Sequence, residues 1–296
     1  MARVNRREYL QSSAAAAALA CLPRALARPL RRISPIGLQL YTVRNLMTSD
    51  PGGTLRSVAA AGYQEVEFAG YFGLSPKQAR AAIDAVGLRA PSCHLDFHAV
   101  SSALPQAIEA AVELGHKFLV NSWIDEGVRI RKGGWSQVAE VLNRAGEATE
   151  KAGIQMAYHN YWSDFEPMPD GRLPYDLLLE RCDSKLVVME MDLCWVEVGG
   201  GDPVDYFNRY PGRFPMVHVK DVKRLPRPSS KEGARLSAER VIPDMTEVGS
   251  GTIDWKRIFA GASRAGIEHY FVEHDQPADP IGSIRKSYQF LSTLRF

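Results

Sequence analysis

Four residues able to bind a metal ion follow one another along the second half of the chain: His159, Asp192, His218 and Glu273. Each lies at the C-terminal end of a predicted β-strand. In a barrel of alternating strands and helices, the C-terminal ends of the parallel strands converge on one mouth. The sequence therefore predicts that side chains more than a hundred positions apart share one divalent ion.

Two imidazoles and two carboxylates form a mixed nitrogen and oxygen donor set. Such a set suits Mn²⁺ or Zn²⁺ first, then Co²⁺, Fe²⁺ or Mg²⁺. Each residue alone has an ordinary alternative, because a strand-end His can be a hydrogen-bonded core residue and an Asp can cap the next helix. Strand alternation also places Glu190 on the same face as Asp192, which predicts a second buried or paired carboxylate there.

Short β-branched stretches alternate with longer helical patterns along the chain. This pattern predicts an α/β fold, a single-domain (β/α)8 TIM barrel. The predicted strands are Ile36–Tyr41, Glu65–Phe68, Arg89–Leu95, Phe118–Ser122, Gln155–Asn160, Leu186–Asp192, Met216–Lys220 and Tyr270–Glu273. The predicted helices are Thr54–Ala61, Pro76–Val86, Leu104–Leu114, Trp135–Ala152, Tyr175–Cys182, Pro203–Tyr210, Trp255–Ala265 and Ile281–Leu294.

Residues 1–27 have the pattern of an export signal. Arg6 and Arg7 precede the apolar run Ser13–Leu22, and Ala25-Leu26-Ala27 follows as a small-residue cleavage site. This order is typical of a twin-arginine signal peptide, and it predicts a periplasmic protein whose barrel spans residues 28–296. An amphipathic surface helix and a lipoprotein anchor at Cys21 are the alternatives.

Charge and hydropathy exclude two classes of partner. Residues 1–27 carry four arginines and one glutamate, so their removal takes the formal net charge from +2 to −1. A near-neutral barrel argues against nucleic acid, which normally demands a basic surface. No stretch of the mature chain approaches the roughly 18 apolar residues of a membrane span, which predicts no stable membrane insertion.

Two long segments follow predicted strands at the mouth. Tyr161–Leu173 is rich in aromatic and acidic residues, and Lys223–Glu247 is polar and basic. Long loops at one end of a scaffold often carry function or act as lids. For Lys223–Glu247 a disordered insertion is an equal alternative.

Several motifs resemble the xylose-isomerase-like barrels of the sugar phosphate isomerase/epimerase family, which is related to D-tagatose 3-epimerase and inosose dehydratase. The resemblance covers roughly Ile36 to Leu291. The motifs are Tyr158-His159-Asn160, Met191-Asp192-Leu193-Cys194-Trp195 with Gly201-Asp202-Pro203, Gly212-Arg213-Phe214-Pro215-Met216-Val217-His218-Val219-Lys220-Asp221, Gly249-Ser250-Gly251-Thr252-Ile253-Asp254-Trp255 and Phe271-Val272-Glu273-His274-Asp275-Gln276-Pro277. The resemblance implies metal ligands at His159, Asp192, His218 and Glu273, a small carbohydrate substrate and pairing into a homodimer.

One position departs from the family pattern. Epimerases of this family carry a Glu at the strand-five position, where it is both a metal ligand and one of two acid–base groups. Here the residue is His159, and a metal-bound histidine is a poor proton acceptor. A second acid–base group must therefore come from elsewhere, with Lys220, Glu166, His94 and Glu67 as candidates.

The resemblance implies proton abstraction next to a sugar carbonyl. A divalent ion would bind the carbonyl and stabilise the enediolate. Glu273 is the expected base, and Lys220 would stabilise the oxyanion or return a proton. The first expected reactions are isomerisation and epimerisation of a free or oxidised sugar. Elimination from a keto-sugar or keto-glycoside is the alternative. The residues expected to bind substrate are Gln39, Glu67, His94, Asn160, Glu166 and Trp195.

Two other function classes share this barrel. A nuclease related to endonuclease IV would need more strand-end ligands and a basic groove, so the near-neutral charge disfavours it. A non-catalytic sugar-binding barrel is consistent with the departure at His159. Export favours free sugars or glycosides over sugar phosphates as ligands.

Overall fold

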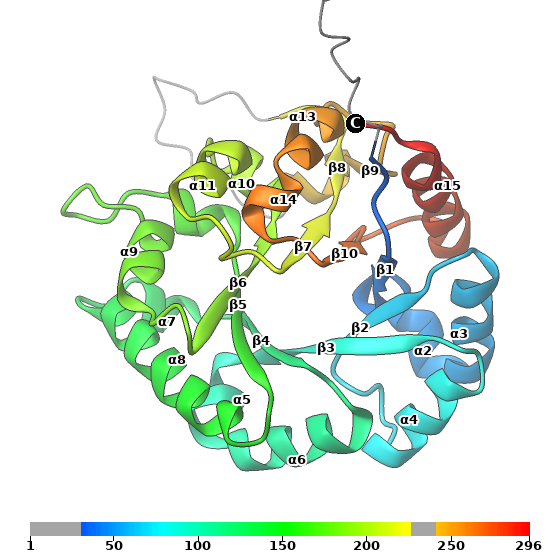
Figure 1. The fold of residues 1–296 in the computed structure, drawn as a ribbon, viewed down its shortest axis with the longest axis horizontal. Helices are drawn as coiled ribbons and strands as arrows, with labels where there is room; N and C mark the ends of the chain where they lie inside the picture. The colour runs from blue at the N-terminus through cyan, green and yellow to red at the C-terminus, as the bar shows by residue number, and fades with distance from the viewer. Residues whose placement is uncertain (1–30, 226–240) are drawn as a thin grey trace, which may run out of the picture. The chain divides into compact units, whose positions relative to one another are not determined.

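The computed structural model describes residues 31–225 and 241–296. Its eight parallel strands close into a barrel in the order β1-β10-β7-β6-β5-β4-β3-β2, with helices around it (Figure 1). The barrel strands are β1 Ile36–Gln39, β2 Glu65–Ala69, β3 Arg89–Asp96, β4 Phe118–Trp123, β5 Gln155–His159, β6 Val187–Asp192, β7 Met216–Val219 and β10 His269–Val272. All eight predicted strands are present, so the predicted TIM barrel is confirmed. The predicted signal peptide, residues 1–27, lies outside the described residues.

The helices follow the strands as expected for βα units. The α-helices are α2 Arg44–Ser49, α3 Pro51–Ala60, α4 Pro76–Asp84, α5 Phe97–Ser102, α6 Leu104–Leu114, α7 Glu126–Arg129, α8 Gly134–Glu150, α9 Pro174–Arg181, α10 Leu193–Val198, α11 Pro203–Arg209, α13 Trp255–Ala260, α14 Ala262–Ala265 and α15 Pro280–Thr293. Short 3-10 turns are η2 Leu40–Val43, η3 Trp162–Phe165 and η4 Ile242–Asp244. In the described residues no helix is both long and apolar enough to cross a membrane.

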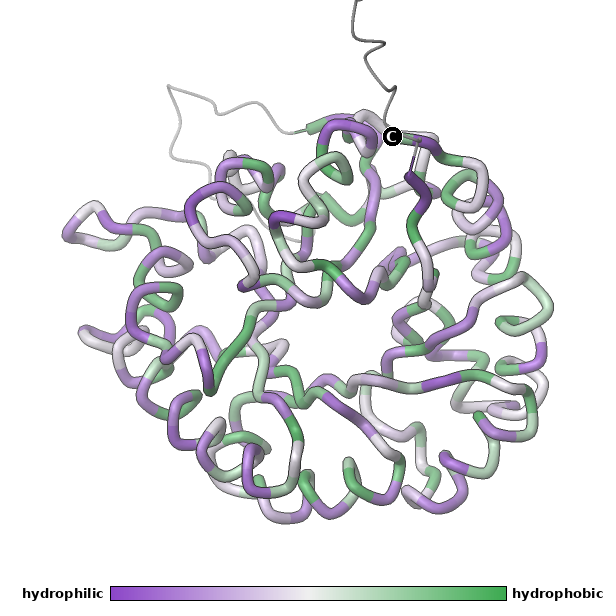
Figure 2. Tube along the Cα trace, viewed as in Figure 1, coloured by the Kyte–Doolittle hydropathy of each residue, from purple (hydrophilic) through white to green (hydrophobic). Residues whose placement is uncertain are grey.

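Hydrophobic and hydrophilic residues alternate around the helical ring, as expected of helices that bury one face (Figure 2). The main core lies between strands and helices. A separate small apolar cluster is formed by one residue from each of four strands, β4, β5, β7 and β10: Val120, Ala157, Met216 and Phe271. His159, His218 and Glu273 each follow a member of this cluster by two positions. Because residues two apart share a face of a strand, they point into the barrel.

The structure differs from the sequence prediction where a strand meets its loop. The first strand was expected to reach Tyr41 but ends at Gln39, because the Gln39 side chain accepts a hydrogen bond from Tyr41 N and begins η2. The helix predicted at Trp255–Ala265 is divided into α13 and α14 at Gly261. Helix α10 was not predicted, and it starts immediately after β6 because Asp192 caps it.

One buried carboxylate, that of Asp221, connects the described parts of the segment after β7 by hydrogen bonds. Strand β8 (Asp221–Val222) pairs with β9 (Met245–Thr246), and residues 226–240 of the predicted functional or lid segment Lys223–Glu247 lie outside the described residues. The buried Asp221 carboxylate accepts hydrogen bonds at 2.9–3.3 Å from the backbone of Val222, Gly249, Gly251 and Ile253 and from the indole of Trp255. A side chain at Gly251 would collide with this carboxylate.

We predict that Asp221→Ala lowers the free energy of unfolding by about 3 kcal/mol, because it leaves several buried N–H groups without an acceptor. Urea denaturation of the metal-free protein measures the loss. Asp84→Ala, which removes a surface ion pair with Arg80, is the control and costs under about 1 kcal/mol. Equal losses in the two variants would contradict this role for Asp221.

Candidate metal centre

The four residues predicted as metal ligands lie together at one end of the barrel. His159 and Asp192 are the last residues of β5 and β6, His218 lies in β7, and Glu273 directly follows β10. All four are buried, and one potential ligand atom of each lies within 4.8 Å of those of the other three. The strand ends therefore converge as the sequence predicts.

The distances between these atoms resemble the edges of a metal coordination shell. His159 Nε2 lies 3.2 Å from His218 Nδ1 and 3.5 Å from Asp192 Oδ2. His218 Nδ1 lies 2.7 Å from Glu273 Oε2 and 3.9 Å from Asp192 Oδ2. Ligand bonds of about 2.1 Å would separate neighbouring donors by about 3.0–3.4 Å. The donor set therefore fits a divalent cation.

Hydrogen bonding around Asp192 supports this fit. Its Oδ1 accepts from Trp195 N and caps α10, so the predicted capping alternative is also real. Its Oδ2 lies 3.0 Å from Lys220 Nζ but, among the described residues, receives no hydrogen bond of good geometry. One carboxylate thus begins a helix with one oxygen and leaves the other for an ion.

His218 lies between two carboxylates. Its Nδ1 is 2.7 Å from Glu273 Oε2, and its Nε2 is 2.6 Å from Glu67 Oε2. Burial alone would lower the pKa of His218, but Glu190 and Glu273 raise it well above its usual value. Metal-bound histidines commonly donate the remaining ring N–H to a carboxylate, which fixes the ring. Glu67 is placed to do this for His218.

Lys220 is enclosed by three carboxylates. Its Nζ lies 2.9 Å from Glu273 Oε2 and 3.0 Å from both Asp192 Oδ2 and Asp275 Oδ1. Burial would lower the Lys220 pKa, but these carboxylates raise it well above its usual value. Burial raises the pKa of Asp275 to about 6, whereas Lys220 and His218 outweigh burial at Glu273 and lower its pKa. Lys220 therefore balances negative charge inside the mouth.

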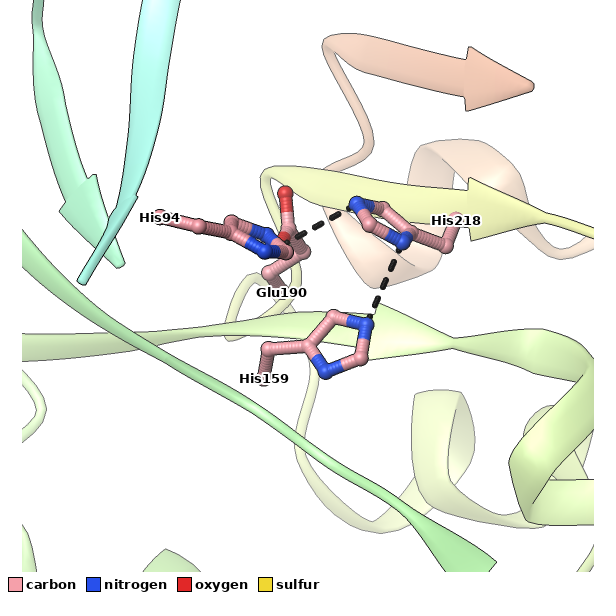
Figure 3. A group of neighbouring side chains, drawn as sticks. All are labelled: His94, His159, Glu190 and His218. Atoms are coloured by element: carbon pink, nitrogen blue, oxygen red, sulfur yellow. Dashed lines mark hydrogen bonds and ion pairs between the residues drawn. The ribbon is translucent and has the colours of Figure 1, made fainter. Parts of the chain in front are cut away.

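A second cluster of polar side chains lies beside the four predicted metal ligands, and the sequence predicted only some of its members. Figure 3 shows His94, Glu190 and His218 close together, with His159 next to them. His94 Nε2 lies 2.7 Å from Glu190 Oε2 and 3.1 Å from Glu67 Oε2. Glu190 was absent from the predicted site, although its parity with Asp192 indicated a second carboxylate on that face.

These two groups share His159 and His218, and both have the spacing of a metal site. The group of Figure 3 pairs its nitrogens with carboxylate oxygens, since His218 Nε2 also lies 3.3 Å from Glu190 Oε2. Such pairs are satisfied as charged hydrogen bonds. The group with Asp192 and Glu273 offers two carboxylates and two ring nitrogens, whereas the group of Figure 3 offers one carboxylate and three ring nitrogens. We regard the first as the candidate centre, because two carboxylates match the charge of a divalent ion.

The remaining predicted substrate residues lie in different positions. The Gln39 amide donates to Glu67 Oε2, and Asn160 exchanges two hydrogen bonds with the Asp192 backbone, so both brace the centre. Trp195 lies just past the end of β6, where it was expected to bind substrate, but its side chain is fully buried in α10. Lys220 Nζ lies 5.5 Å from its ring centre. Glu166 follows η3 and belongs to neither metal-binding group.

Comparison with known proteins identifies the family. The family described as xylose isomerase-like TIM barrel matches residues 55–294. The chain therefore belongs to this family, and proteins similar to it are inosose dehydratases and a sugar phosphate isomerase/epimerase.

Inosose dehydratase of Lacticaseibacillus casei is 26% identical over 207 residues, 67% of this chain and 67% of that protein. The Geobacillus thermodenitrificans inosose dehydratase is 27% identical over 163 residues, so that match spans only 53% of either protein.

Two solved structures extend the comparison across the barrel. A sugar phosphate isomerase/epimerase from Parabacteroides distasonis matches with a TM-score of 0.69 and 26% identity, covering 87% of this chain and 93% of that one. The IOLI protein, whose structure has a bound zinc atom, matches with a TM-score of 0.67 and 15% identity, covering 86% and 95%. A divalent metal is thus present in a protein of the same fold.

We predict that Glu67→Gln lowers the affinity for Mn²⁺ or Zn²⁺ about 10- to 100-fold, because His218 loses the carboxylate that orients its ring. Competition with a chelating dye measures the affinity. Glu65→Gln, on the same strand but paired with Arg89 and His269 away from the centre, should leave it unchanged. Unchanged affinity in Glu67→Gln would contradict the assignment.

Proposed function

We propose that this protein is a divalent-metal-dependent enzyme that removes the proton next to a carbonyl of a sugar. The observation that carries the proposal is the convergence of His159, Asp192, His218 and Glu273 on one point. A bound Mn²⁺ or Zn²⁺ would polarise the carbonyl and stabilise the enediolate. The comparisons support the reaction class, since similar proteins are named inosose dehydratase and sugar phosphate isomerase/epimerase.

Glu273 is suited to take the proton. Burial would raise its pKa, but the Lys220 ammonium and the His218 ring keep it ionised. Those contacts use Oε2, and among the described residues no donor binds Oε1. Glu273 can therefore accept a proton from a substrate carbon.

The second proton-transfer group is better supplied by His94 than by Lys220. The Lys220 side chain is only 3% exposed and faces three carboxylates, whereas the His94 side chain is 13% exposed. His94 Nε2 is held by Glu190 and Glu67, and in the described part of the chain Nδ1 has no hydrogen-bond partner. A ring anchored by one nitrogen can exchange a proton through the other.

Elimination is the second candidate reaction, and two observations favour it. Related curated proteins are inosose dehydratases. The two proposed proton-transfer groups also differ, since Glu273 is a carboxylate and His94 an imidazole. Elimination needs one base and one acid, which such a pair can supply. Glu273 would take the carbon-bound proton, the adjacent carbon–oxygen bond would break as a carbon–carbon double bond forms, and His94 would give its proton to the leaving oxygen.

The predicted export signal bears on the substrate. We propose that the protein is exported to the periplasm and meets free or oxidised sugars there, since phosphorylated sugars are mainly cytoplasmic. Fractionation of cells that produce the full chain, compared with an Arg6→Lys, Arg7→Lys variant, tests this. Equal periplasmic amounts of both proteins would contradict a twin-arginine route.

We predict that Glu273→Gln lowers solvent deuterium incorporation into a keto-sugar by at least about 10³-fold, because the amide cannot accept the proton. NMR of the sugar carbon measures incorporation with Mn²⁺-loaded protein. Glu268→Gln, at an exposed residue that directly precedes β10, should leave the rate unchanged. No incorporation by the unaltered protein across a panel of keto-sugars would indicate a non-catalytic sugar-binding barrel.

His94→Gln should behave differently from Glu273→Gln. It should retain deuterium incorporation within a few-fold but lower product formation about 10²- to 10³-fold, because only the second proton transfer is lost. Metal content is measured in parallel, and the exposed His98→Gln is the control. Equal loss of both rates at full metal content would exclude this role for His94.

A further inference from the structure

An aromatic ring lies open to solvent at the edge of the barrel mouth. Trp123 is the last residue of β4, and β4 lies next to β5, which ends at His159. Trp123 is 45% exposed, an unusual state for the largest apolar side chain. Its position at a strand end places it on the same side of the barrel as the metal centre.

Successive ring contacts connect Trp123 with the metal centre. Trp123 meets Tyr161 edge to face, with ring centres 5.6 Å apart. Tyr161 in turn meets the ring of His159, with centres 5.1 Å apart. Tyr161 therefore lies between the ring of His159 at the candidate metal centre and the exposed ring of Trp123.

Polar groups surround the exposed ring. Trp123, Arg129 and Tyr161 line one concavity together with Ser122 and Ser163. The Arg129 guanidinium carbon lies 5.8 Å from the Trp123 ring centre, and its Nε donates to Ile124 O, which holds the group in place. The concavity itself is small, about 10 Å³, so a sugar would have to lie on the exposed face of Trp123. That face and the Arg129 guanidinium beside it offer an apolar surface and a hydrogen-bond donor, which suit a ring with an apolar face and hydroxyl groups.

We propose that Trp123, Tyr161 and Arg129 form an outer subsite that binds the second sugar ring of a glycoside. This inference rests on the proposed function for the position of the first ring, and it narrows the substrate class to molecules of two or more rings. Trp123 stacks on the second ring, and Arg129 donates hydrogen bonds to its hydroxyls. A monosaccharide reaches only the inner site.

Binding of unoxidised sugars tests the subsite without any turnover. Isothermal titration of the Mn²⁺-loaded full chain compares cellobiose, maltose and trehalose with glucose. We expect at least one disaccharide to bind about tenfold more tightly than glucose, and Trp123→Ala to remove this difference. Trp123→Phe should retain most of it, because a ring remains.

The control is Ile130→Ala, a truncation of a 66% exposed apolar residue on the same loop, which should change nothing. Equal binding of glucose and every disaccharide, no binding at all, or equal effects of Trp123→Ala and Ile130→Ala would each overturn the subsite. Disaccharide binding without turnover would leave the subsite standing and refute the proposed reaction. Turnover of keto-monosaccharides with no preference for substrates of two rings would refute the subsite and support the proposed reaction.

Discussion

The structure depends on compensating several buried carboxylates at one barrel mouth. Five acidic residues lie within one connected network there: Glu67, Glu190, Asp192, Glu273 and Asp275. A buried carboxylate is costly unless positive charge or hydrogen bonds offset its lost hydration. The Lys220 ammonium compensates the charge of Asp192, Glu273 and Asp275. The imidazoles of His94 and His218 contact the other two, Glu67 and Glu190. In the proposed function, a divalent cation would supply further compensation where His159, Asp192, His218 and Glu273 converge.

The barrel places this charge where chemistry can use it. Ala157, Met216 and Phe271 belong to an apolar cluster, and His159, His218 and Glu273 follow them by two positions on the same face of each strand. This apolar cluster therefore lies beside the polar network, on the side away from the strand ends. In the proposed function, the residues of this network would have different tasks. Glu67, Gln39 and Asn160 would orient the metal-binding side chains, Lys220 would balance charge, and Glu273 and His94 would contact the substrate.

Much of this arrangement could be predicted from sequence, because the strand pattern and strand-end residues are local features. The eight strands follow from periodicity, and the convergence of His159, Asp192, His218 and Glu273 follows from their positions at the strand ends of a barrel. The contacts among Glu67, His94 and Glu190 could not be predicted, since they depend on the distance across the closed barrel between strands far apart in sequence. The burial of Trp195 was missed because Asp192 begins α10 without a loop. That Trp123 is exposed follows from tertiary packing, which a sequence pattern does not contain.

Anomalous diffraction from a crystal of the Mn²⁺-loaded protein tests the central claim most directly. We expect one strong peak at about 2.0–2.3 Å from His159 Nε2, His218 Nδ1, Asp192 Oδ2 and Glu273 Oε2. A peak between His94 and Glu190 would show that the wrong group was assigned. No peak at either position would contradict the metal-dependent account altogether.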